Sequence, residues 1–175
     1  MRRKVAIAIL IIATFIVQTT VFQRLQVASV APNLLLILTV SFGFMRGKKS
    51  GMWIGFFCGL FIDLLYGQTI GIHALIYMYL GYLNGFLYKV FYDDDIKVPV
   101  LLIGVSDFAY CLVTYIFQFL MRVRLDFTDY LHHIIIPEVV YTMIISIVFY
   151  RFLYKLNQKF VENEMEGQEL PWLKR

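Results

Sequence analysis

The stretch Gly51-Met-Trp-Ile-Gly55-Phe-Phe-Cys-Gly59-Leu-Phe-Ile-Asp63 places three glycines and one carboxylate four residues apart in an otherwise apolar segment. On an α-helix, this spacing puts all four on one slowly rotating stripe. Glycine destabilises helices in water, but in a membrane helix it lets a neighbouring helix approach closely. A carboxylate on the same stripe should face protein, because lipid disfavours it by about 2.5–3.5 kcal/mol. The stretch therefore predicts a membrane helix whose stripe packs against another helix, in this molecule or in a partner.

The composition of the whole chain agrees with a membrane location. Of its 175 residues, 60% are hydrophobic and 16% are charged. A soluble domain usually has about 45–50% apolar and about 25% charged residues. One core of this size cannot bury the excess, so most of the chain should lie in a bilayer. The net charge of +4 follows the loops between apolar runs, and we expect no nucleic-acid binding.

Apolar runs predict an all-α fold with one six-helix transmembrane domain over residues 1–158 and a polar cytoplasmic tail over residues 159–175. The predicted spans are residues 5–22, 32–45, 52–66, 70–88, 99–120 and 134–154. The second and third are short, since a full span usually needs about 20 residues. The basic N-terminus with its apolar run is similar to a secretory signal, but we expect a retained first helix.

The basic residues predict the orientation of these helices. If the N-terminus is cytoplasmic, the outer segments hold only Arg24, Arg122 and Arg124, and the other 13 of the 16 basic residues lie inside. The positive-inside rule then favours six spans with both termini in the cytoplasm.

Four ionisable residues lie within or at the ends of the predicted spans. Asp63, His73 and Glu138 fall near the outer ends, whereas Asp107 lies about 12 Å from the inner end at 1.5 Å per residue. We expect at least two of the first three to share an outward polar pocket. Because no chain of charged residues continues past Asp107, a proton pathway is not expected.

The sequence contains no pattern of an enzyme, a cofactor site or a complete metal site. There is no Ser/His/Asp or Cys/His arrangement, no phosphate-binding glycine loop and no zinc-ligand helix. Cys58 and Cys111 fall in apolar runs and are expected to be small buried hydrophobes. The acidic run Asp93-Asp94-Asp95 lacks calcium-loop spacing, and His132-His133 lacks a third ligand, so no metal is predicted.

A longer pattern around the glycine stripe resembles a known family. It comprises Ala31-Pro32-Asn33-Leu34-Leu35-Leu36-Ile37-Leu38, then Phe42, Arg46-Gly47, Gly51, Gly55-Phe56, Gly59-Leu60 and Asp63, then Gly71, Ala74-Leu75, Tyr79 and Gly81-Tyr82. Over about residues 31 to 86 the chain resembles the bacterial rod shape-determining MreD family. The resemblance adds Pro32, Asn33, Arg46 and Gly47 to the three stripe glycines as candidate helix-packing or partner-binding residues.

The resemblance implies a non-enzymatic scaffold in the bacterial plasma membrane that helps direct sidewall peptidoglycan synthesis and maintain rod shape. The implied partners are an MreC-type bitopic protein, an MreB-type filament, a RodA-type wall synthase and a penicillin-binding transpeptidase. The family is also similar to the six-helix substrate-binding subunits of energy-coupling-factor vitamin transporters, which gives the rival function. A scaffold needs an exposed small-residue face, whereas a substrate-binding subunit needs an enclosed pocket lined by polar groups.

Overall fold

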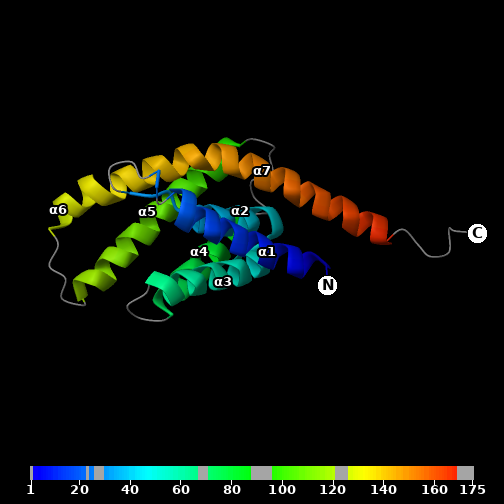
Figure 1. The fold of residues 1–175 in the computed structure, drawn as a ribbon, viewed down its shortest axis with the longest axis horizontal. Coiled ribbons are helices and arrows are strands. Elements are labelled where there is room, and N and C mark those ends of the chain that lie inside the picture. Colours follow the sequence, from blue (N-terminus) through cyan, green and yellow to red (C-terminus); the bar gives the residue numbers. More distant parts are fainter. Residues whose placement is uncertain are drawn as a thin grey trace, which may run out of the picture.

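The computed structural model describes residues 2–22, 24–25, 30–66, 71–87, 96–120 and 126–168, and the regular elements there are helices (Figure 1). The predicted all-α class is therefore confirmed. The helices are α1 (Arg2–Val17, continued by a π-helical segment, Gln18–Phe22), α2 (Leu34–Arg46), α3 (Lys48–Tyr66), α4 (Ile72–Phe86), α5 (Lys97–Leu120), α6 (Phe127–Tyr130) and α7 (Ile136–Gln168), with a π-helical segment, Leu131–Ile135, between α6 and α7.

The short helix α2 forms the centre of the bundle. Its side chains from Leu34 to Phe44 are all buried, and it packs against α1, α3, α4, α5 and α7. The Asn33 side chain caps its first turn by accepting a hydrogen bond from the Leu36 N–H (3.2 Å). At 1.5 Å per residue, its 13 residues rise only about 20 Å. This short length is compatible with a membrane domain because protein, rather than lipid, surrounds the helix.

A single residue, Gly47, separates α2 from α3. Its φ of 85° lies in the left-handed region that glycine adopts without strain, and its N–H donates to the Gly43 carbonyl (2.8 Å). The chain therefore reverses within one residue, where the sequence predicts a gap from residue 46 to residue 51. The turn expected at residues 67–69 lies outside the described residues.

Three helical segments are long and apolar enough to cross a membrane, namely Val5–Phe22, Lys97–Phe117 and Phe127–Lys159. Only 17%, 33% and 22% of their apolar windows are buried inside the molecule. Their remaining apolar side chains face outward, as lipid contact requires. The chain is thus a membrane protein.

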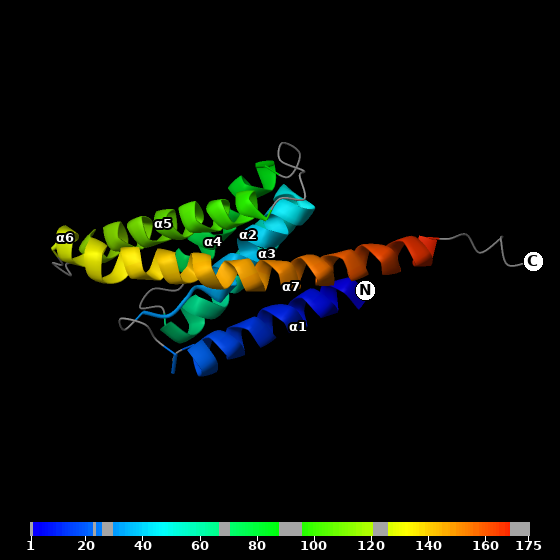
Figure 2. The ribbon, with the colours of Figure 1, turned by 90° about the horizontal axis from the view of Figure 1, so that it is seen from above.

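Helix α7 runs along the longest dimension of the molecule and extends well past the other helices (Figure 1). The N-terminus and the C-terminal half of α7 lie at one end, and α6 lies at the other (Figures 1 and 2). The helix continues to Gln168, beyond the predicted span end at residue 154, so the predicted polar tail is helical over residues 159–168. The rest of that tail lies outside the described residues.

Candidate functional site

The glycine stripe of α3 packs directly against the backbone of α4. A Cβ added at Gly51 would lie 2.9 Å from the Gly81 carbonyl carbon, and one added at Gly55 would lie 2.7 Å from the carbonyl carbon of Tyr77. One added at Gly59 would lie 2.6 Å from the His73 carbonyl carbon. These separations are shorter than real Cβ contacts, so only glycine permits this approach.

The sequence left open whether the stripe packs against a helix of this molecule or of a partner, and in the structure it packs against α4. The stripe is buried within the chain and is covered by α4, so it is not available to a partner helix. The exposed small-residue face expected of a scaffold is therefore not formed by Gly51, Gly55 and Gly59. The reason is that the backbone of α4 lies against the three glycines, at Gly81, Tyr77 and His73.

Asp63, the last member of the stripe, caps the first turn of α4. Its carboxylate accepts hydrogen bonds from the N–H groups of Gly71 (2.9 Å), His73 (3.1 Å) and Ala74 (2.9 Å). The His73 ring nitrogen Nδ1 lies 2.8 Å from the same carboxylate. A helix N-terminus offers unpaired N–H groups and favours negative charge, so this buried acid is stabilised by the helix that it holds.

The structure therefore brings together two of the three residues that we expected to share an outward pocket, Asp63 and His73. Glu138 does not join them, because it lies on α7 beside α5 instead. Asp63 and His73 meet at the N-terminus of α4, which Asp63 caps. Both Asp63 oxygens accept hydrogen bonds there.

Asn33 links three helices at the centre of the molecule. Its side-chain oxygen accepts a hydrogen bond from the Tyr77 hydroxyl of α4 (2.6 Å), and its backbone N–H donates to Thr142 Oγ1 of α7 (3.2 Å). The preceding Pro32 is buried, and at the other end of α2 the Arg46 Nε donates to the Asn157 side chain of α7. Asn33 and Arg46, two of the candidate residues that the family resemblance adds, thus connect α2 to α4 and α7.

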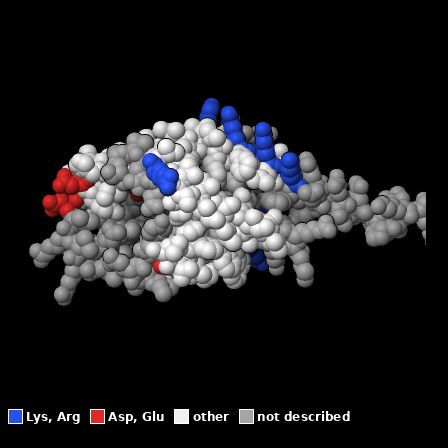
Figure 3. All heavy atoms as spheres, in the orientation of Figure 1, with Lys and Arg blue, Asp and Glu red and all other residues white. Residues whose placement is uncertain are grey.

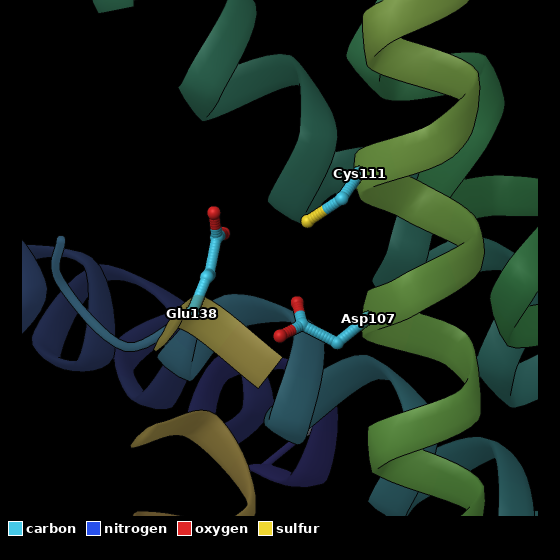
Figure 4. A group of neighbouring side chains, drawn as sticks. All are labelled: Asp107, Cys111 and Glu138. Carbon is cyan, nitrogen blue, oxygen red and sulfur yellow. The ribbon is translucent and has the colours of Figure 1, made fainter. Parts of the chain in front are cut away.

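Asp107 and Cys111 of α5 lie close to Glu138 of α7 and form a polar cluster with it (Figure 4). One ligand atom from each of the three side chains lies within 4.8 Å of those of the other two. Asp107 and Cys111 are one turn apart and project from the same face of α5. Asp107 and Cys111 are buried, and Glu138 is partly exposed.

The Asp107 carboxylate is unusual within this cluster. Both oxygens are buried and neither has a hydrogen-bond partner of acceptable geometry, although the side chains of Thr142 and Asn33 are its polar neighbours. A buried polar group without a partner costs about 1–3 kcal/mol, and more when it is charged. Cys111, which the sequence predicts only to be a small buried hydrophobe, is thus a functional candidate, and the signal for it is its four-residue spacing from Asp107.

Within the part of the chain that the structure describes, His132 and His133 belong to no group of potential metal ligands. The Nδ1 atoms of His132 and His133 lie 3.0 Å and 3.1 Å from the backbone carbonyls of Thr128 and Asp129, so each ring bonds to the preceding turn. The acidic run at residues 93–95 lies outside the described residues.

A family model described as the rod shape-determining protein MreD matches residues 1–160. The match extends well beyond residues 31 to 86, over which the resemblance is seen in the sequence. It includes Asp63 and His73 as well as the cluster of Asp107, Cys111 and Glu138. No curated protein and no solved structure matches the chain significantly.

Proposed function

Because the chain belongs to the rod shape-determining protein MreD family, we propose that it is a non-enzymatic membrane scaffold of the cell elongation machinery. In this role it helps direct sidewall peptidoglycan synthesis and so maintains rod cell shape. The observation that carries the proposal is the family match over residues 1–160, which includes every described helix except the last part of α7.

The proposed partners are proteins of the same machinery. They are an MreC-type bitopic membrane protein, an MreB-type filament, a RodA-type wall synthase and a penicillin-binding transpeptidase. Since α4 covers the glycine stripe, docking has to use other surfaces of the bundle. The outward apolar faces of α1, α5 and α7 are available either to lipid or to the membrane helix of a partner.

The hydrogen bonds of Asp63 and Asn33 support the scaffold over the vitamin-binding alternative. A substrate pocket needs convergent polar groups that are free to bind a ligand. The Asp63 carboxylate is already bonded by the first turn of α4, and the Asn33 side chain is bonded by Leu36 and Tyr77. Both groups therefore serve packing between helices.

We further propose six spans with both termini in the cytoplasm. Figure 3 shows acidic side chains at the α6 end, where Asp126 and Asp129 are exposed, and basic side chains toward the C-terminal half of α7. The basic end is also the end at which the N-terminus lies (Figures 1 and 2). Under the positive-inside rule, this end faces the cytoplasm.

Cysteine labelling tests the orientation. Asp129 and Lys159 are both exposed and thirty residues apart, a helical rise of about 45 Å that exceeds the hydrocarbon thickness of about 30 Å. In intact cells without an outer-membrane barrier, a membrane-impermeant thiol reagent should label Asp129→Cys but not Lys159→Cys. Opening the cells should make Lys159→Cys reactive, and the parent chain, with both native cysteines buried, is the control. Labelling of Lys159→Cys in intact cells would reverse the proposed orientation.

Purification in mild detergent tests the function. An affinity-tagged chain should recover a single-pass wall-assembly protein, and depletion of the chain from its host should convert rods to rounded cells. A tagged, unrelated polytopic protein expressed at the same level is the control. Recovery of a vitamin-sized molecule or an ATPase module, with cell shape unchanged on depletion, would favour the transporter subunit instead.

A further inference from the structure

The cluster of Asp107, Cys111 and Glu138 brings three potentially anionic groups together inside a membrane protein. In the described part of the chain, no lysine or arginine forms an ion pair with either carboxylate. Uncompensated charge at such a position is strongly unfavourable. Either protons or a bound cation must therefore neutralise the cluster.

The geometry argues against a proton shared directly between the carboxyl groups. A hydrogen bond of that kind requires two oxygens about 2.5–2.7 Å apart. Among the described residues, neither Asp107 oxygen has a hydrogen-bond partner of acceptable geometry, so Glu138 does not provide one. The three side chains instead extend from α5 and α7 into the same region, and their ligand atoms lie within 4.8 Å of one another (Figure 4).

This separation of the ligand atoms is close to that in a metal site. Tetrahedral zinc binds carboxylate oxygen at about 2.0–2.2 Å and thiolate sulfur at about 2.3 Å, which places neighbouring ligand atoms about 3–4 Å apart. The three donor atoms lie within 4.8 Å of one another, so movements of about 1 Å would complete the set. Glu138 has the longest of the three side chains and is partly exposed, and it provides both the adjustment and a route of entry.

The donor types select the class of cation. Magnesium and calcium prefer oxygen ligands alone, whereas a cysteine sulfur beside carboxylates suits zinc and similar divalent ions. We propose that Asp107, Cys111 and Glu138 bind one divalent cation of the zinc type, which joins α5 to the first turn of α7. Three protein ligands leave a fourth position for water.

The position of this site gives it a structural consequence. Thr142 lies one turn after Glu138 on α7 and accepts the hydrogen bond from the Asn33 N–H. A cation that fixes α5 against α7 therefore also fixes the α7 surface that contacts the central helix α2. This inference does not depend on the proposed scaffold role.

Metal analysis of the full-length protein in mild detergent tests the proposal. After equilibration with zinc and removal of free metal, elemental analysis should find about one zinc per wild-type chain. Cys111→Ser and Glu138→Gln should each weaken zinc binding by at least about tenfold. Cys58→Ser is the matched control, because Cys58 is also buried but is not in the cluster, and it should retain the metal.

Cobalt substitution provides a second measurement that does not depend on protein stability alone. Cobalt bound to the wild-type chain should give a thiolate-to-cobalt charge-transfer band, and this band should be absent from Cys111→Ser that elutes as a single folded species. If the wild-type chain takes up neither metal, protons neutralise the cluster and the proposal is overturned. Equal zinc content in wild type and Cys111→Ser would also overturn it.

Discussion

Replacing Gly55 by leucine should prevent α3 from packing against α4 and leave little folded protein in the membrane. Even the first added carbon would lie 2.7 Å from the Tyr77 carbonyl carbon and 2.9 Å from Thr39 Cγ2. The carbonyl belongs to the backbone of α4, so no rotamer change can relieve the contact. Overpacking of a core usually costs about 1–3 kcal/mol, and this site should exceed that range because the helices themselves must separate.

The measurement is the yield of monodisperse protein in detergent, followed by thermal unfolding of whatever is recovered. Gly104 provides the matched control, since a Cβ there would meet the flexible side chain of Met143 rather than backbone. We expect Gly104→Ala to retain most of the yield and Gly55→Ala to lose much of it. Wild-type yield and melting temperature for Gly55→Leu would show that the helices do not approach as closely as described.

The glycine stripe also shows how far local spacing predicts this structure. Four-residue spacing is sufficient to place Gly51, Gly55 and Gly59 on one face, and the same spacing recurs at Tyr77 and Gly81 of α4. The inward direction of the stripe follows from these patterns. Its partner does not, because the choice between α4 and another molecule depends on how all the helices pack together.

The predicted depth of a residue in the membrane indicates its contacts less well than residue spacing indicates a helix face. Asp63, His73 and Glu138 have similar predicted depths, yet only the first two meet, because α3 and α4 are adjacent whereas Glu138 faces α5. Depth does not specify the rotation of a helix or its position around the bundle. For the same reason, depth does not predict the contact of Glu138 with Cys111.

The central position of α2 could not be predicted either. Its apolar run reads as a short membrane span, and an apolar sequence suits lipid and a protein core equally well. Only tertiary packing shows that Leu35 and Ile37 contact protein on all sides. The Asn33 cap and the left-handed Gly47 explain why polar and flexible residues flank that run.

Replacing Asp63 by asparagine should destabilise the protein strongly, although the two side chains have nearly the same shape. Each Asp63 oxygen has two polar neighbours: Oδ2 accepts from the N–H groups of Gly71 and Ala74, and Oδ1 accepts from the His73 N–H and faces the ring nitrogen Nδ1 of His73. Asparagine retains one oxygen, which can accept from Gly71 and Ala74, and its NH₂ group can donate to His73 Nδ1 in the neutral tautomer. The His73 backbone N–H would then face a group that cannot accept. An unsatisfied buried donor costs about 1–3 kcal/mol, so we expect a loss of that size.

The decisive comparison for this prediction is with Asp126→Asn. Asp126 also precedes a helix, but it is exposed and its side chain makes no capping bond, so that change should alter stability by less than about 0.5 kcal/mol. Thermal unfolding in detergent measures both variants, and cell shape on complementation measures their function. If Asp63 acts as a cap, stability and cell shape should fail together in Asp63→Asn. A variant of wild-type stability that fails to restore rod shape would instead show that the Asp63 charge itself is needed, and the capping role would not explain the residue.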